Sequence, residues 1–86
     1  MSVINMKCTE MQAGKRGRIL RINLKETDRR RLLTLGIYEG SLFMVERNEP
    51  RSGMLILFVC GNFLMLRYRD GEKIEVIQNE ENSICR

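Results

Sequence analysis

The chain has 86 residues, of which 43% are hydrophobic and 30% are charged, and its net charge is +4. This length and composition predict one small globular domain over residues 1–86, and they exclude a disordered chain and a second hydrophobic core. No apolar run approaches the roughly 20 residues of a membrane-spanning helix, and the N-terminus lacks the pattern of a secretory signal peptide, so we expect a cytoplasmic protein.

The residue types offer little basis for catalysis or metal binding. Histidine is absent, which removes the most common general base and metal ligand. The cysteines, Cys8, Cys60 and Cys85, form no CxxC pair and predict reduced thiols; Cys60 ends an apolar run and is expected in the core. Carboxylates three residues apart on the predicted strands would face opposite sides of the sheet, so they could not easily bind the same metal ion. We therefore expect no enzyme activity, no cofactor and no metal site.

Positive charge is concentrated in the N-terminal part of the chain. The first 31 residues contain nine basic and three acidic residues, whereas the rest contains six basic and eight acidic residues. A basic segment of this kind can attract nucleic acid, anionic lipid or an acidic protein, or it can be a solvated face. The excess of Arg over Lys favours bidentate contacts with either carboxylate or phosphate, so charge alone does not choose a partner.

The first predicted strand covers residues 18–24 and follows a turn over residues 11–17. Two glycines of the turn, Gly14 and Gly17, can adopt positive φ. Alternation along the strand places three apolar side chains on one face: Leu20, Ile22 and Leu24. Ile19 then falls at the end of the polar face.

One short helix is predicted over residues 28–35. Thr27 is a suitable N-cap, Gly36 ends the helix, and Ile37 can close the hydrophobic contact at the helix end. Leu32 and Leu35 share one face, and the remaining surface carries Arg29, Arg30 and Arg31. Two turns of helix are unstable alone, so this helix must dock on the domain.

The second half of the chain predicts β-structure. Strands are expected over residues 41–47, 54–60, 63–69 and 73–77, separated by turns at 50–53, at Gly61-Asn62 and at Asp70-Gly71. Residues 78–86 are expected to form a polar tail, which leaves a core over residues 11–77. Tight turns between short strands favour a small barrel over a flat sheet. The predicted fold is mostly β, with about five strands and one short helix between the first two strands.

Several short motifs occur in an informative order. They are Gly14-x-x-Gly17-x-Ile19, Arg31-Leu32-x-x-Leu35-Gly36, Glu39-Gly40, Gly61-Asn62-Phe63-Leu64-Met65-Leu66-Arg67 and Ile74-Glu75-Val76. In this order they resemble the FeoA family, small cytoplasmic components of bacterial ferrous iron transport. The resemblance implies an SH3-like barrel and a role beside FeoB, a membrane protein with a cytoplasmic GTP-binding domain that moves Fe²⁺.

Two segments depart from the family pattern. Glu39 stands where members often carry proline, which predicts a less rigid turn, and Tyr68-Arg69-Asp70-Gly71 replaces an Ala-containing helical turn, so an open loop is expected there. The same domain type ends metal-dependent repressors, but the chain has no helix-turn-helix pattern, which favours a freestanding accessory protein. Fe²⁺ favours imidazole and carboxylate ligands, whereas this sequence has no histidine and no pair of carboxylates expected to converge. We therefore interpret any association of the protein with metal as an association with the transport pathway.

The leading functional hypothesis is a non-catalytic accessory protein that binds or regulates the FeoB-type transporter and meets the membrane only through it. The alternative is a sequence-independent nucleic-acid-binding barrel, because Gly14-Lys15-Arg16-Gly17-Arg18-Ile19 also resembles the entry of ribosome- and transcription-associated SH3-like domains. The first 37 residues contain no aromatic side chain on which bases could stack, which disfavours that alternative.

Two surfaces are candidates for partner contact. The first combines the helix with the turn after it: Arg29, Arg30, Arg31, Ile37 and Tyr38. The second is the outer face of the hairpin over residues 54–66, where alternation sends either one apolar row or the other outward; the candidates there are Met54, Ile56 and Phe58. The transporter or a second copy of the chain would bind there. The competing interpretations are solvated arginines and an outer face covered by Val3, Ile4 and Met6.

Overall fold

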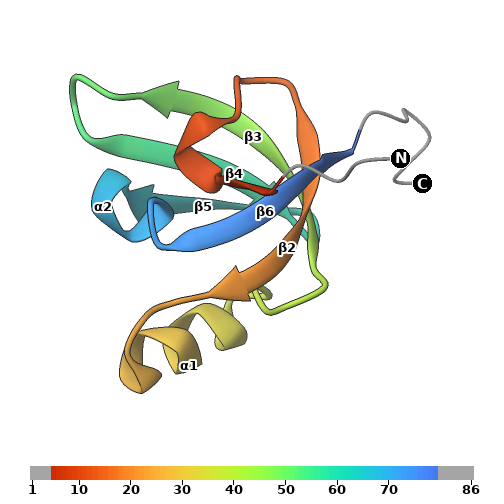
Figure 1. Cartoon of the computed structure of the whole chain (residues 1–86), viewed down its shortest axis with the longest axis vertical. Helices are drawn as coiled ribbons and strands as arrows, with labels where there is room; N and C mark the ends of the chain where they lie inside the picture. Colours follow the sequence, from red (N-terminus) through yellow and green to blue (C-terminus); the bar gives the residue numbers. More distant parts are fainter. Residues whose placement is uncertain (1–4, 80–86) are drawn as a thin grey trace.

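Six antiparallel strands form one open sheet that curls around the hydrophobic core in the computed structural model, which describes residues 5–79 (Figure 1). The strands are β1 (Asn5–Lys7), β2 (Arg16–Ile22), β3 (Leu42–Glu49), β4 (Met54–Val59), β5 (Asn62–Arg67) and β6 (Ile74–Asn79). The helical segments are η1 (Cys8–Glu10), α1 (Glu26–Thr34) and α2 (Tyr68–Gly71). The strand order β1-β6-β2-β3-β4-β5 makes β1 and β5 the two edges.

The mostly β architecture predicted from the sequence is confirmed, and three details differ. There are six strands rather than about five, because Asn5–Lys7 pairs with β6, so the helix follows the second strand. The sheet is open rather than closed. The predicted polar tail begins too early, since Gln78 and Asn79 belong to β6 and pair with β2; residues 80–86 lie outside the described part of the chain.

The face prediction for β2 is wrong at two residues because the strand contains a bulge. Its pairing with β6 shifts between Ile19 and Arg21, so Leu20 is an additional residue in the ladder. A bulge reverses the alternation of side chains beyond it. As a result Ile19 and Ile22 are both buried in the core, whereas Leu20 is only half-buried.

Gly17 lies inside β2 and does not adopt positive φ, unlike Gly14, whose φ is +91°. Its role is close approach: a Cβ at Gly17 would lie 2.7 Å from the carbonyl oxygen of Ile77 and 3.0 Å from Cζ of Phe43. The glycine-bracketed entry predicted from the sequence therefore combines one turn residue with one packing residue.

Helix α1 begins two residues earlier than predicted and ends one residue earlier, at Thr34, with Gly36 terminating it as predicted. Lys25, not Thr27, is its N-cap. At the other end Gly36 has φ +95°, and the amide of Ile37 donates to the carbonyl of Leu32 at 2.9 Å. The amide of Gly36 also donates, to the carbonyl of Leu33 at 3.0 Å. This pair of bonds is the Schellman arrangement, and it turns the chain sharply toward β3.

The hairpin between β4 and β5 turns one residue earlier than predicted. Its two loop residues are Cys60 and Gly61, with φ of 51° and 81°, and Val59 pairs with Asn62. Positive φ at both positions is typical of a tight hairpin whose twist matches its strands. Because Cys60 occupies this turn, its side chain is exposed, and the prediction that it is a core residue is wrong.

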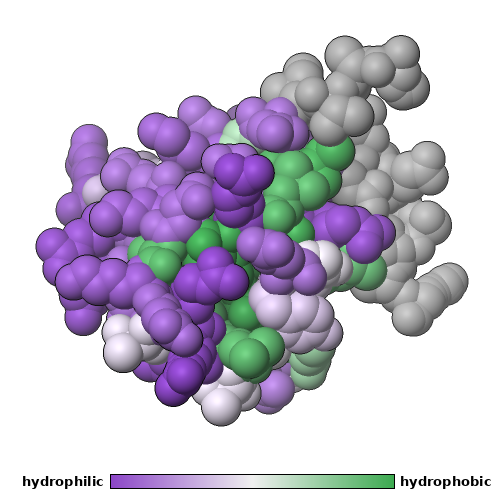
Figure 2. All heavy atoms as spheres, turned by 60° about the horizontal axis from the view of Figure 1, so that its bottom comes forward, coloured by the Kyte–Doolittle hydropathy of each residue, from purple (hydrophilic) through white to green (hydrophobic). Residues whose placement is uncertain are grey.

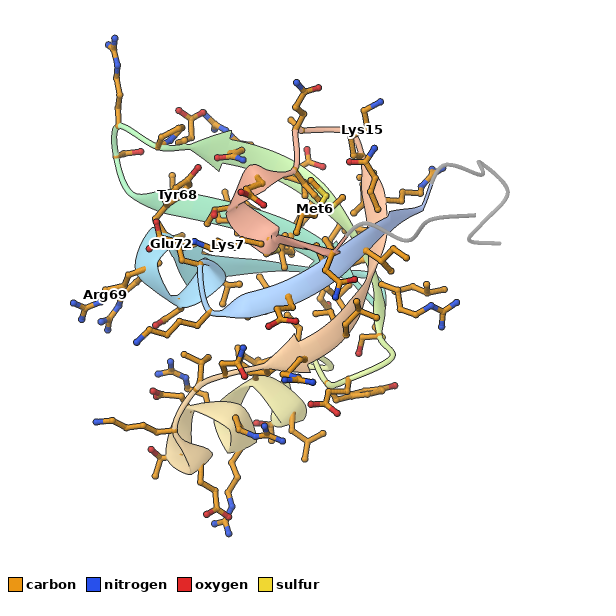
Figure 3. All side chains as sticks on the ribbon, viewed as in Figure 1. Met6, Lys7, Lys15, Tyr68, Arg69 and Glu72 are labelled. Atoms are coloured by element: carbon orange, nitrogen blue, oxygen red, sulfur yellow. The ribbon has the colours of Figure 1, made fainter. Side chains whose placement is uncertain are left out.

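The open loop expected after β5 is a helical turn, α2. Gly71 lets it pack closely, since a Cβ there would lie 2.8 Å from Cδ2 of Leu55. The hydroxyl of Tyr68, labelled in Figure 3, donates to Oδ1 of Asn48 at 2.8 Å. Nδ2 of Asn48 in turn donates to the carbonyl of Met11 at 2.7 Å. These bonds join α2, β3 and the segment after η1.

Candidate partner-binding surface

Helix α1 is held against the sheet by one leucine and one arginine. Leu32 is the buried residue of the helix and belongs to the hydrophobic core. Nη1 of Arg29 donates to the carbonyl oxygen of Ile22, at the end of β2, over 2.9 Å. This bond satisfies a strand-end acceptor, so Arg29 has a structural role in addition to any contact with a partner.

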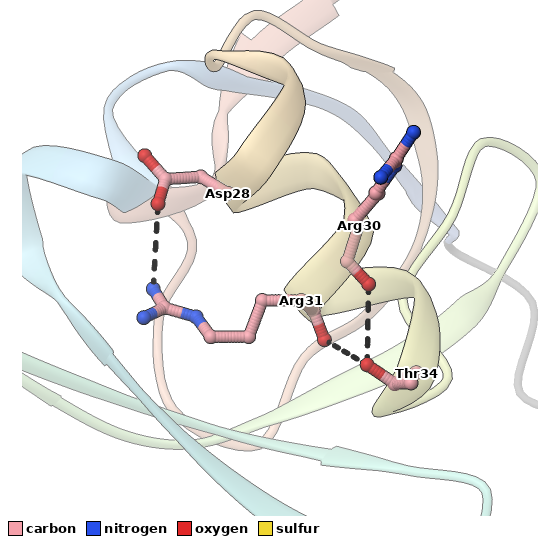
Figure 4. Close-up of polar contacts among 4 residues, drawn as sticks. All are labelled: Asp28, Arg30, Arg31 and Thr34. Carbon is pink, nitrogen blue, oxygen red and sulfur yellow. Dashed lines mark hydrogen bonds and ion pairs between the residues drawn. The ribbon is translucent and has the colours of Figure 1, made fainter.

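The other two arginines face solvent and pair within the helix. Nη2 of Arg30 lies 3.4 Å from Oε2 of Glu26, and Nη2 of Arg31 lies 3.8 Å from Oδ1 of Asp28. Figure 4 shows the second pair, together with the hydroxyl of Thr34 bonded to the helix backbone. Exposed pairs of this kind contribute little to stability, so both guanidinium groups remain available to a partner.

The turn after α1 is held by hydrogen bonds. Glu39 in this turn predicts a less rigid backbone than proline would give. The amide of Tyr38 donates to Oγ of Ser41 at 2.9 Å, and that hydroxyl donates to the carbonyl of Gly36 at 3.0 Å. The amide of Gly40 donates to the carbonyl of Ile19 at 2.7 Å. The turn is thus tied both to the helix end and to β2, and it presents the ring of Tyr38 outward.

A groove of about 220 Å³ lies between α1 and this turn, and we call it the helix–turn groove. It is lined by Ile22, Glu26, Arg29, Arg30, Leu33, Ile37, Tyr38 and Glu39. Leu33 is 56% exposed and Tyr38 is 48% exposed. Figure 2 turns the α1 side forward and shows hydrophobic residues, in green, lying among hydrophilic residues, in purple, on this face. The groove therefore combines exposed apolar surface with guanidinium groups.

The structure brings four of the five predicted helix and turn residues together at this groove: Arg29, Arg30, Ile37 and Tyr38. Of these four, Ile37 is 0% exposed and packs in the core, so it supports the groove from beneath. Leu33 also lines the groove and was not among the residues predicted from the sequence. The available signal was its position beside Leu32, because once Leu32 faces the sheet the next side chain of the helix points about 100° away from it.

The predicted outer row of the hairpin consists of Met54, Ile56 and Phe58. The alternate residues of β4 face the core, and these three are half-buried. The ring of Phe58 lies 5.0 Å from that of Phe63 between centroids. On β5 the exposure is greater, at 65% for Phe63 and 63% for Met65. The exposed apolar surface of the hairpin is thus centred on β5 rather than on β4.

Met6 does not cover this surface. It lies on β1, at the sheet edge opposite β5, and is partly buried against the core. Val3 and Ile4, the other residues proposed as a cover, lie outside the described part of the chain. Arg31 belongs to neither surface described so far, because it lines a second groove between α1 and β5.

Within residues 5–79 no cluster of three or more carboxylate or thiol side chains could hold a metal ion. The helices of the same region include none that is long and apolar enough to cross a bilayer. Burial raises the pKa of the Cys8 thiol to about 12, which keeps it protonated and unsuited to metal ligation at neutral pH. The described surface carries two grooves lined by exposed apolar side chains and arginines, residue types that are common at protein-binding surfaces.

Several solved structures have a fold similar to that of this chain. The FeoA protein from Chlorobium tepidum is 28% identical and superposes with a TM-score of 0.81 over 91% of this chain and 75% of its own. An iron uptake regulatory protein, FeoA, is 21% identical, with a TM-score of 0.79 over 90% of this chain and 100% of its own. A manganese-dependent transcriptional repressor, 18% identical, gives 0.81 over 92% of this chain and 44% of its own. No curated protein matches the sequence.

The sequence itself carries the family signal. The model of the FeoA domain matches residues 6–78, which includes both grooves and every strand except the ends of β1 and β6. The structural neighbours agree with an SH3-like fold. This chain therefore belongs to the FeoA domain family, whose members are small accessory domains associated with ferrous iron transport.

Proposed function

We propose that this FeoA-family protein is a non-catalytic accessory protein of bacterial ferrous iron uptake that binds the cytoplasmic region of the FeoB-type transporter and regulates it. It works in the cytoplasm and reaches the membrane only through the transporter. Family membership supports the pathway. The observation that carries the binding role is the helix–turn groove, where exposed Leu33 and Tyr38 lie beside Arg29 and Arg30.

Exposed apolar side chains gathered at a groove commonly mark a binding surface on a small protein. Aromatic and arginine side chains are the residue types that most often dominate the energy of such contacts. The helix–turn groove has both, and its turn is fixed by the hydrogen bonds of Ser41, so little ordering is needed on binding. The partner surface should therefore offer apolar groups flanked by carboxylates.

Binding to the purified cytoplasmic region of the transporter tests the proposal. We expect Leu33→Asp and Tyr38→Ala each to raise the Kd about tenfold or more, because each removes an exposed apolar contact of the groove. Leu42→Asp is the matched control, since Leu42 is similarly exposed and lies outside the groove lining. Calorimetry measures the Kd, and unchanged binding by both folded groove variants would remove this surface from consideration.

A further inference from the structure

Strand β5 is an edge of the sheet, and its backbone groups can be assigned a direction. The amide of Tyr68 donates to the carbonyl of Gly53 at 2.8 Å, and the β4–β5 pairing continues from this pair without a shift. In an antiparallel ladder, residues bonded to the neighbouring strand alternate with residues whose backbone groups point away. The N–H and C=O groups of Phe63 and Met65 and the N–H group of Arg67 therefore point away from β4, whereas the carbonyl of Arg67, the N-cap of α2, belongs to that helical turn.

These outward groups are not used by another strand. Within the part of the chain that the structure describes, β5 pairs with β4 alone. A row of free donors and acceptors on an edge strand is a template for pairing with a further segment. Natural proteins usually protect such an edge with charged side chains, yet here Phe63 and Met65 are among the most exposed apolar residues.

A second observation concerns the space beside this edge. A groove of about 200 Å³ lies between β5 and α1, and we call it the strand–helix groove. It is lined by Arg31, Leu32, Leu35, Leu64, Met65, Leu66, Arg67 and Asp70. An edge strand that faces a helix across a groove can accept an extended segment as an added strand, while the helix contacts the side chains of that segment.

The charge of the groove indicates what kind of segment fits. Arg31 lies on its helix wall and Arg67 on its strand wall, and Asp70 is the one carboxylate among the lining residues. The pair of Arg31 with Asp28 is long and exposed, so it leaves Arg31 free to exchange partners. A second copy of this chain would bring the same two arginines to the contact. The balance of charge therefore favours a partner with carboxylates.

We propose that the strand–helix groove binds an extended segment of a partner protein, with alternating apolar side chains and flanking carboxylates, which adds as a further strand on β5. The backbone of the segment bonds to Phe63, Met65 and Arg67, and its apolar side chains contact Leu35 and Met65. Its carboxylates pair with Arg31 and Arg67. The inference goes beyond the function proposed above, because it concerns another surface and does not require the transporter as partner.

Two synthetic heptapeptides test the inference by NMR titration of the full chain. One is acetyl-Glu-Val-Thr-Val-Thr-Val-Glu-amide, and the other has lysine at both glutamate positions. We expect the acidic peptide to shift the amide signals of Phe63, Met65 and Arg67 and to slow their hydrogen exchange. The lysine peptide should bind about fivefold more weakly or worse, because it meets two arginines.

A pair of variants separates backbone pairing from side-chain contact. Met65→Pro removes one outward N–H, and because that group points away from β4 the sheet should keep its ladder. Met65→Ala removes the side chain and keeps the N–H. We expect the proline variant to lose peptide binding and the alanine variant to retain most of it. If the proline variant fails to fold, the exchange of the three amides in the unaltered protein gives the answer.

Three outcomes would overturn the inference. The first is that the acidic peptide changes neither the signals nor the exchange of the three amides, and the second is that both peptides bind equally well. The third is that the protein sediments as a dimer whose formation slows the hydrogen exchange of the same amides, which would assign the β5 edge to a second copy of the chain. Leu33→Asp, in the helix–turn groove, should leave peptide binding unchanged. Failure here is thus separable from failure of the transporter-binding proposal, which is measured with a different ligand.

Discussion

At the scale of single residues, the two described cysteines have opposite environments. Cys8 is fully buried, and burial raises the pKa of its thiol to about 12. Cys60 lies exposed at the turn between β4 and β5. Since the thiolate is the reactive form, access and pKa together decide reactivity. The raised pKa also means that protonated Cys8 stabilises the fold below the usual thiol range, and that this contribution is lost as pH rises toward 12.

Thiol titration with a disulfide reagent at about pH 8 checks this contrast in a Cys85→Ser variant, which leaves only these two thiols. We expect Cys60 to react at once and Cys8 to react only after denaturant is added, because the reagent cannot reach a buried, protonated thiol. Adding Cys60→Ser should abolish the fast phase and leave the slow one. Equal rates for both thiols in the folded protein would contradict the burial of Cys8.

At the scale of elements, α1 depends on the sheet for its stability. A helix of nine residues is too short to persist alone. It is attached by the burial of Leu32 and by the bond from Arg29 to the carbonyl of Ile22. Neighbouring arginines of the same helix therefore differ in what they do: Arg29 joins two elements, whereas Arg30 pairs with Glu26 in solvent.

Alanine substitutions at these two arginines should separate the roles. We expect Arg29→Ala to lower the free energy of unfolding by about 1–2 kcal/mol, because the partly buried carbonyl of Ile22 loses a charged donor. Arg30→Ala should change it by about 0.5 kcal/mol or less, since its ion pair is exposed. Urea denaturation measures both. Similar losses of unfolding free energy in the two variants would show that the hydrogen bond from Arg29 to Ile22 stabilises the protein no more than the exposed ion pair of Arg30 does.

At the scale of the whole molecule, the charge distribution bears on the alternative function, nucleic-acid binding. Much of the basic N-terminal part becomes β2 and α1. The three arginines of α1 line grooves that also contain exposed apolar side chains, whereas the arginines of β2 line neither groove. Contacts with phosphate alone depend strongly on salt. Protein contacts that bury apolar surface depend on it much less.

A salt titration distinguishes these two kinds of binding. Fluorescence anisotropy with labelled single-stranded RNA and duplex DNA should show no binding at about 0.15 M salt, because sequence-independent charge contacts are then screened. Binding to the transporter region in the same buffer should persist. Retained anisotropy signal with either nucleic acid at this salt concentration would favour the nucleic-acid-binding alternative over the one proposed above.

Some features of this protein follow from its sequence alone, because short-range physics decides them. The end of α1 at Gly36 and the turn at Gly53 depend on residues that accept positive φ. The apolar run over residues 54–60 predicts a strand, and the alternation of side chains along any strand predicts that one of its two rows is buried. The order of short motifs is sufficient to indicate the FeoA family, and the family model matches the same region.

Other features were decided only by contacts between segments far apart in the chain. The bulge at Leu20 depends on the register of β2 against β6, and that register buries Ile19 against expectation. Which row of β4 faces the core is set by what packs inside the sheet, not by the alternation itself. The strand–helix groove exists because α1 docks beside β5, about thirty residues away in sequence, and local propensity carries no information about such a distant contact.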